Sequence, residues 1–225
     1  MAETTTGSLS RPESLSRQIY ATLREGIIRG QYPQGSRLAE QRLAEELAVS
    51  RVPLREAVPL LEMDGFVRTL PRRGAVVSTW SVAAADDLFD LRLYLEVGAA
   101  AYAARQVAAG VSTQDLAAAL ERSSAGSTGG DRYRVAEARS GFHDAIVELT
   151  GNALMTTLMR PISNRMTWLF YLTAEPDSPD PALGNGQLFR AITSGNDRVA
   201  EAVAYARIEC DRRDSLDALR RIGVE

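Results

Sequence analysis

The chain has 225 residues, of which 45% are hydrophobic and 24% are charged, so it can bury one or two hydrophobic cores and is neither disordered nor fibrous. All 26 basic residues are arginine, and the net charge of −3 argues against nucleic-acid binding by the chain as a whole. Residues 1–79, however, contain 11 arginines and 9 acidic residues, a net charge of +2, whereas residues 80–225 contain 15 and 20, a net charge of −5. The basic excess therefore lies in the first third.

Cysteine and histidine usage excludes several further classes of protein. A single cysteine, Cys210, cannot form an internal disulfide, which favours a reducing, cytoplasmic location. The polar segment over residues 1–12 is expected to be a flexible tail rather than a signal peptide, and no apolar run approaches the roughly 18 residues that span a bilayer. The chain has one histidine, His143, which excludes a metal site built from several histidines. The sequence also contains no nucleophile elbow and no phosphate-binding glycine loop, so we expect that the protein is not an enzyme.

Three helices are predicted in the first third. Apolar residues recur every fourth position over residues 14–30, and a short helix is expected over 40–47. Ser50 is placed to cap a third helix through its hydroxyl, with Pro53 in the first turn of that helix and an end at residues 64–65.

A basic turn joins two short predicted strands after these helices. The strands cover residues 66–70 and 75–77, so three helices and a hairpin make a winged helix-turn-helix, which we assign to residues 13–79. Inside the third helix, Pro59 removes the hydrogen bond to the carbonyl of Arg55. We therefore expect a bend there, at a cost that approaches about 3 kcal/mol.

Residues 80–225 are predicted to be all-helical, because strand-like alternation does not return after Thr79. Asn152 is expected to cap one helix, and Pro161 to kink or split it. Glycine-rich residues 125–130 are expected to be flexible, and residues 175–186, rich in Pro, Asp and Gly, to form a loop. The expected helices cover residues 81–109, 112–124, 131–150, 152–172, 187–194 and 196–221.

The third helix carries residue types suited to DNA. Arg51 and Arg55 are four positions apart and share a helix face, and a guanidinium pairs bidentately with guanine or phosphate. Val52 and Pro53 suit contact with a thymine methyl group. The alternative is that the two arginines only form surface ion pairs, with Glu45, Glu46, Glu56 or Glu62. Other candidates are Gln41 for a phosphate and Arg72 and Arg73 for the minor groove.

The segments 31–44, 49–57, 61–67 and 71–77 resemble the DNA-binding domain of GntR-family bacterial transcription regulators. The resemblance covers residues 18–81 and implies a homodimer on a pseudo-palindromic double-stranded operator. The residues that it assigns to DNA are Arg37, Gln41, Arg51, Val52, Pro53, Arg55, Arg72, Arg73 and Gly74.

Residues 87–215 resemble the FadR-type effector domain of that family, the FCD domain, through segments 87–96, 142–143 with 150–152, and 191–196. The resemblance implies an antiparallel bundle of six or seven helices around a ligand cavity and assigns residues 80–225 to effector binding and dimerisation. Many members hold a divalent metal with one aspartate and three histidines. The matching positions here are Arg139, His143, Asn185 and Arg207, so only one ligand survives, and we expect no metal because guanidinium groups repel cations.

The residues at these positions predict a positively charged site where the family's metal-binding members have metal ligands. Arg139 and His143 share a helix face, and Arg207 together with Arg92, the family's usual carboxylate-contacting arginine, would complete a site that binds a small organic anion directly. The predicted function is a repressor released by such an effector. The alternative is a constitutive regulator with a dead pocket, in which Arg139 and Arg207 pair with Asp144, Glu148, Glu201 or Glu209. The aromatic residues Trp168, Phe170 and Tyr171 are expected in the bundle core.

Overall fold

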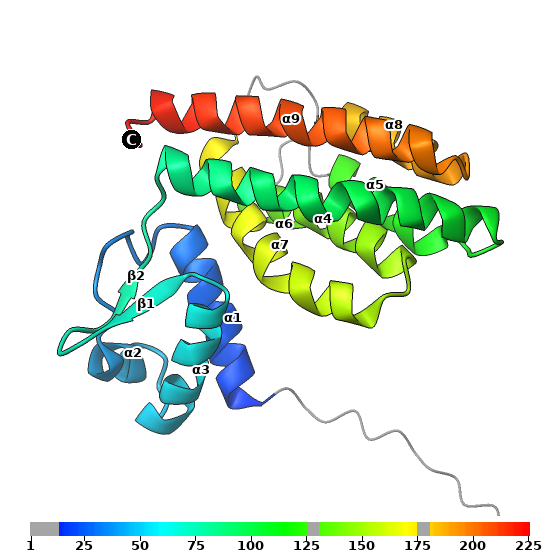
Figure 1. The fold of residues 1–225 in the computed structure, drawn as a ribbon. Coiled ribbons are helices and arrows are strands. Elements are labelled where there is room, and N and C mark those ends of the chain that lie inside the picture. The colour runs from blue at the N-terminus through cyan, green and yellow to red at the C-terminus, as the bar shows by residue number, and fades with distance from the viewer. Residues whose placement is uncertain (1–13, 126–130, 175–180) are drawn as a thin grey trace, which may run out of the picture.

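The computed structural model describes residues 14–125, 131–174 and 181–225, and the structural statements below refer to these ranges. The protein is mainly helical, with a winged helix-turn-helix followed by a helical bundle (Figure 1). No helix within the described ranges has both the length and the apolarity needed to cross a bilayer. The tail expected over residues 1–12 and most of the segment expected to be flexible over 125–130 lie outside the described residues.

The first part, residues 14–79, is called the winged part here. Its helices are α1 (Leu15–Ile28), α2 (Glu40–Glu46) and α3 (Arg51–Met63), as the hydrophobic periodicity predicts. Leu23 of α1 and Leu54 and Leu61 of α3 are fully buried and form the centre of its core. Gly65 follows α3 at a φ of +76°, the left-handed conformation that ends a helix at little cost for glycine.

The wing is an antiparallel hairpin. Strands β1 (Val67–Leu70) and β2 (Gly74–Val77) pair in register, with Val67 opposite Val77. Residues 35–38 run along the other edge of β2, where the Leu38 amide donates to the Ala75 carbonyl at 2.9 Å. That third segment anchors the wing to the helices and leaves only its tip projecting.

The predicted cap at Ser50 and the predicted bend at Pro59 can be compared with the structure of α3. Ser50 is the N-terminal boundary residue of α3, but its side chain makes no capping hydrogen bond. Pro53 has no N–H, so only one of the two amides that such a hydroxyl can reach, that of Val52, is left as a donor, and Ser50 does not bond it. The helix continues through Pro59 without ending, and the bend expected there stays a prediction.

The second part, residues 80–225, is called the helical part, and its described residues form six helices. Helix α4 packs along α9, and α6 packs against both α5 and α7 (Figure 1). The Asn152 side chain caps α7 by accepting from the Met155 amide at 3.1 Å, as expected. The helices are α4 (Val82–Ala108), α5 (Gln114–Ala125), α6 (Arg132–Leu149), α7 (Ala153–Thr173), α8 (Pro181–Thr193) and α9 (Asp197–Arg221).

Two predictions in the helical part need correction. Helix α7 is not split at Pro161 but runs through it as one 21-residue helix, so the expected split is wrong, while the kink expected there as the alternative stays a prediction. Helix α8 begins at Pro181, so residues 181–186 are helical and not part of a loop, while residues 175–180 lie outside the described ranges. Proline is well tolerated in the first turn of a helix, and tertiary packing on α9 and α5 outweighs the poor helix propensity of the two glycines that follow.

Aromatic stacking joins the two parts. Phe66, just before β1, stacks on Trp168 of α7 with ring centroids 5.5 Å apart, and Trp80 meets the same indole edge-on at 5.7 Å. The Arg165 guanidinium lies 4.7 Å from the Trp80 ring and donates to the carbonyl of Gly65 at 3.2 Å. All three aromatic side chains are buried, so the contact is a continuous piece of core.

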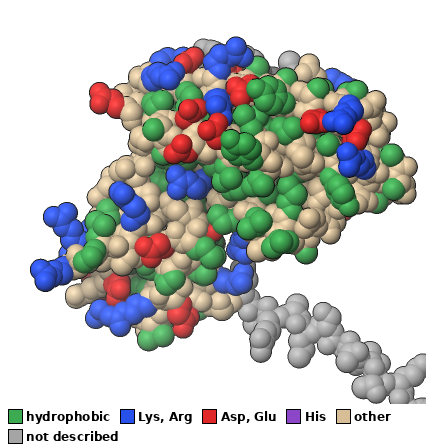
Figure 2. Space-filling view, in the orientation of Figure 1, with side chains coloured by type: hydrophobic (Ala, Val, Ile, Leu, Met, Phe, Trp, Pro, Cys, Tyr) green, Lys and Arg blue, Asp and Glu red, His purple; other side chains and the backbone are tan. Residues whose placement is uncertain are grey.

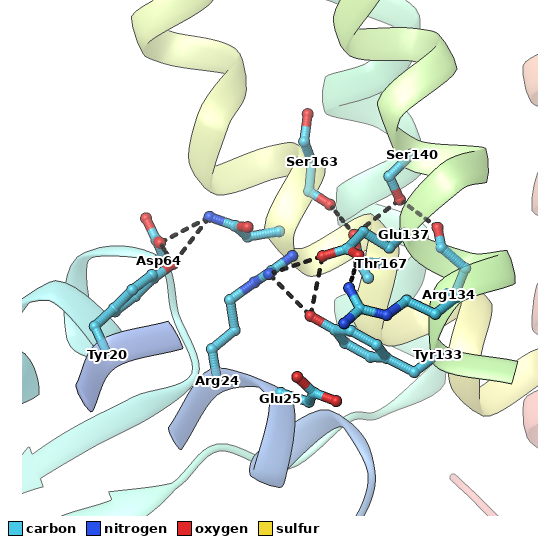
Figure 3. A network of polar contacts seen from close by, with 12 residues as sticks. Tyr20, Arg24, Glu25, Asp64, Tyr133, Arg134, Glu137, Ser140, Ser163 and Thr167 are labelled. Carbon is cyan, nitrogen blue, oxygen red and sulfur yellow. Dashed lines mark hydrogen bonds and ion pairs between the residues drawn. The ribbon is translucent and has the colours of Figure 1, made fainter. Parts of the chain in front are cut away.

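Polar contacts also join the two parts (Figure 3). Asn164 of α7 donates to the buried carboxylate of Asp64 at 2.8 Å, and the Tyr20 hydroxyl of α1 donates to the same oxygen. Further along α1, Arg24 donates to the Tyr133 hydroxyl of α6 at 3.1 Å. Burial and the bond to Asp64 raise the pKa of Tyr20 above its ordinary value. The winged part is thus held against α6 and α7 by hydrogen bonds as well as by packing.

Replacing Pro59 by alanine should stabilise the winged part. The side chain is exposed, so little packing is lost, and the new amide can donate to the Arg55 carbonyl. We expect the free energy of unfolding to rise by up to about 3 kcal/mol. Urea denaturation followed by circular dichroism measures this, and an unchanged or lower midpoint would contradict the expected cost of the proline.

Candidate functional site

The start of α3 presents two arginines to solvent. Arg51 is 58% exposed and Arg55 is 61% exposed, and both pair with the Glu40 carboxylate at the start of α2, at 3.3 Å and 3.0 Å. The hydrogen bond from Arg55 lowers the pKa of Glu40. The partner is none of the four glutamates considered from the sequence, because α2 and α3 approach each other only in the folded structure. The two arginines lie side by side on one exposed face, and ion pairs that are exposed to solvent are weak.

The other residues assigned to DNA are also exposed or partly exposed. Val52 is exposed, Pro53 is half-buried, and the Gln41 amide donates to Glu45 at 3.3 Å. Arginine side chains project from the end of the winged part that lies farthest from the helical part (Figure 2). At the wing tip, the exposed residues are Arg72, Arg73 and Gly74, and Arg37 lies beside β2 opposite Val76.

The centre of the helical part contains a buried charged cluster. Arg92 of α4 is fully buried, and its Nε donates to the Glu96 carboxylate one turn later at 2.8 Å. His143 of α6 meets the other oxygen of that carboxylate through Nδ1 at 2.9 Å. Glu96 therefore fixes both the guanidinium and the imidazole.

A second carboxylate, Asp211 of α9, collects the remaining arginines. Its Oδ1 lies 2.6 Å from Nη2 of Arg139 and 3.0 Å from Nη2 of Arg207, and its Oδ2 lies 3.6 Å from Nη1 of Arg92. Asp211 is only 1% exposed. Three helices, α4, α6 and α9, thus send guanidinium groups to a single buried carboxylate.

Apolar and backbone surfaces hold the arginines in place. The Arg139 guanidinium lies 3.7 Å from the ring centroid of Phe170 on α7, a cation–π contact from a residue that the sequence places in the core. Arg207 lies flat against α8, where a Cβ added to Gly184 would come within 2.6 Å of its guanidinium carbon. Glycine in α8 therefore makes room for the charged group.

Charge in the cluster is unbalanced. Three guanidinium cations face the two carboxylates Glu96 and Asp211, which leaves one formal positive charge in excess when His143 is not counted. Burial alone would raise the pKa of Glu96, but Arg92 and His143 outweigh it and hold that pKa at about 2. Burial likewise opposes ionisation of Asp211, and Arg139, Arg207 and Arg92 overcome it to give a pKa of about 2. Both carboxylates are ionised at neutral pH.

Four of the five residues assigned to the effector meet in this cluster: Arg92, Arg139, His143 and Arg207. The fifth, Asn185, is fully buried, and its amide donates to Ser123 at 3.4 Å; among the described residues no hydrogen bond joins it to the arginines. Sequence reasoning missed the two carboxylates. Their spacing was a usable signal, because Glu96 and Asp211 each lie four residues after an arginine of the cluster.

The metal that many FCD domains hold does not fit these residues. Two of the matching positions, Arg139 and Arg207, direct guanidinium groups at Asp211, where a divalent cation would have to approach. Within the described ranges, no three acidic, histidine or cysteine side chains are grouped as metal ligands. Beside the cluster, a cavity of about 10 Å³ lies against Glu96 and His143 and is otherwise apolar, with room for about one water molecule.

Comparison with protein families finds two matches. Residues 15–77 match the family described as bacterial regulatory proteins, gntR family, and residues 87–209 match the FCD domain. The first match spans α1 to β2, and the second spans α4 to most of α9.

Individual relatives agree with these matches. An uncharacterised helix-turn-helix transcriptional regulator from the TAR-I ttuE-ttuC' intergenic region of Agrobacterium vitis is 32% identical over 138 residues, 57% of this chain and 76% of that protein. The gluconate operon transcriptional repressor of Bacillus licheniformis is 38% identical over 79 residues, 35% of this chain and 32% of that protein. The fold is similar to a crystal structure of a GntR regulator from Rhodococcus sp. RHA1, with a TM-score of 0.76, 23% identity and coverage of 90% and 97% of the two chains.

Acid should destabilise the protein through the two buried carboxylates. Their pKa values in the folded protein, about 2, lie below the ordinary 4.5 of Glu96 and 3.8 of Asp211, so the unfolded chain binds more protons in that range. The stabilisation is complete above about pH 5 and is lost as the pH falls towards 2. Urea midpoints measured from pH 6 to pH 3 should therefore fall, and fall less steeply in Asp211→Asn. Parallel slopes for the two proteins would contradict the assignment.

Proposed function

This chain belongs to the GntR family of bacterial regulatory proteins and carries an FCD domain, and from that premise we propose that it is a repressor released by a small organic anion bound directly by arginines, without a metal. The chain is a transcriptional regulator by family. The observation that supports the anionic effector is the buried excess of guanidinium charge around Asp211. An organic carboxylate pairs bidentately with such groups.

We propose that the exposed face of α3 and the wing contact the operator DNA. Arg51 and Arg55 are both exposed and adjacent, and the Glu40 carboxylate that holds them costs little to release because the pairs are exposed. Arg72 and Arg73 are exposed in the turn of the hairpin, from which we expect them to reach a flanking groove or its phosphates.

A homodimer is proposed to form through the outer face of α4. Leu91, Tyr94 and Tyr102 recur along that face and are exposed, Tyr94 at 80%. Hydrophobic side chains gather there in the space-filling view (Figure 2). Exposed apolar patches of this kind mark interfaces, and a two-fold dimer would present two recognition helices to a pseudo-palindromic operator.

A cytoplasmic location stays a prediction.

Helix α7 is the proposed link between effector and DNA. Its Phe170 lies under Arg139, while Trp168 and Asn164 of the same helix contact the winged part. An effector that binds the two arrangements of these parts unequally shifts their populations, and only such unequal binding changes DNA affinity.

Arg51→Ala should remove discrimination between DNA sequences. Duplexes selected from a random pool by the wild-type protein serve as the specific probe, and fluorescence anisotropy compares them with unselected duplex. Loss of one bidentate base contact should cost about 1–3 kcal/mol of specific binding per half-site and leave random-duplex binding nearly unchanged. The control is Arg198→Ala, an exposed arginine of α9 with the same change in charge. Equal loss on both probes would mean that Arg51 contacts only phosphate.

Arg139→Ala should abolish effector binding. Thermal-shift measurements with organic acids, sugar acids, fatty acids and acyl-CoA compounds, each with and without Mg²⁺ or Zn²⁺, should find an anion that stabilises the wild-type protein without metal. The same anion should not stabilise Arg139→Ala and should weaken operator binding of the wild type. Metal-dependent stabilisation that survives in Arg139→Ala would refute direct binding, and the absence of any ligand would favour the constitutive regulator.

A further inference from the structure

We propose that the Asp211 carboxylate occupies the place of the effector's own carboxylate, so that the effector must be an anion that displaces Asp211 from the three arginines. The inference rests on the proposed function, because the same arginines are proposed to hold the effector. It adds to that function that Asp211 competes with the effector for the arginines, and it names the chemical class of the effector.

The geometry of the ion pairs of Asp211 supports the displacement of Asp211 by an effector. Arg139 and Arg207 both approach the same oxygen, Oδ1, at 2.6 Å and 3.0 Å, while Arg92 stays 3.6 Å from Oδ2. The carboxylate is tethered to α9 and cannot turn both oxygens to all three groups. A free carboxylate has no such tether and can pair with two guanidinium groups through both oxygens.

Unused hydrogen-bonding groups surround the ion pairs. Within the cluster, four of the buried atoms that have no hydrogen-bond partner among the described residues are Nη1 of Arg92, Nε of Arg139, Nε of Arg207 and Oδ2 of Asp211. Leaving such an atom without a partner in a protein interior is unfavourable. The arginines therefore offer more donors than Asp211 uses, as expected where an internal group substitutes for a better ligand.

Space at the cluster requires displacement rather than addition. The adjoining cavity of about 10 Å³ holds about one water molecule, which is too little for a carboxylate group. Beyond Glu96 and His143 its walls are apolar, formed by Ala99, Ala100, Ile146, Val147, Leu188, Ala204 and Ile208. The ligand class that fits is a small carboxylate whose head replaces Asp211 and whose apolar substituent is no larger than this water-sized cavity.

Displacement of Asp211 would act on the helix that follows the wing. The next residue, Arg212, pairs with Asp86 at 3.4 Å and with Asp90, both in the first turns of α4. At the end of the chain, the Glu225 carbonyl accepts from the Val82 amide at 3.2 Å. A shift of α9 is therefore transmitted to the start of α4, directly after β2.

Chemical rescue tests the proposal. Asp211→Ala leaves the three arginines without their carboxylate, and we expect sodium acetate to raise its thermal midpoint by about 3 °C or more, well beyond its effect on the wild type at equal ionic strength. Two controls are Asp90→Ala, which frees the exposed side of Arg212, and Glu96→Ala, which removes the other buried carboxylate. Equal acetate effects in Asp211→Ala and in either control would overturn the proposal.

Asp211→Asn covers the case in which Asp211→Ala does not fold. Acetate titrated by calorimetry should bind Asp211→Asn at least tenfold more tightly than the wild type, and equal affinity would overturn the inference. The two proposals fail separately. If an anion from the effector screen binds the wild type through Arg139 but binds Asp211→Asn no more tightly, only the displacement is wrong. If acetate rescues Asp211→Ala while the wild type responds to no anion in the screen, the effector-released repressor is wrong.

Discussion

One buried carboxylate, Asp211, determines how the helical part is built. Three guanidinium groups from different helices can share a dry interior only if an anion lies between them, because an unpaired buried charge costs several kcal/mol. The carboxylate fixes the relative positions of α4, α6 and α9. Glu96 performs the same task for Arg92 and His143. Ion pairing, rather than apolar packing alone, organises this core.

From that centre the structure continues to the winged part without a gap in packing. Arg139 rests on Phe170, and two positions earlier on α7 Trp168 stacks on Phe66. Asn164, one turn further back, bonds the buried carboxylate of Asp64 at the end of α3. The end of the recognition helix and the arginine cluster are therefore attached to the same helix. A small movement of α7 would be felt at both, because packed interfaces shift between discrete arrangements rather than deform continuously.

At the surface of α3 that is proposed to contact DNA, the ion pairs are of a different kind. Arg51 and Arg55 share Glu40 in solvent, where water and salt weaken each ion pair. The same pairing of arginine with carboxylate is thus shielded from water and salt at Asp211 and open to both at Glu40, and burial makes the difference. A surface that must exchange a carboxylate for phosphate or base edges benefits from weak pairs, whereas a core benefits from strong ones.

The sequence by itself determined the winged helix-turn-helix, the helical second part and most helix ends, because hydrophobic periodicity, glycine positions and side-chain caps are local signals. Through the matching family positions it also identified the three arginines, Arg92, Arg139 and Arg207, that meet in the buried cluster. Only the tertiary structure decided the partners of the arginines: Glu40 for Arg51 and Arg55, and Asp211 for Arg139 and Arg207. It also decided the unbroken α7 and the early start of α8. Partner choice depends on which helices lie side by side, and periodicity along one helix carries no information about the next.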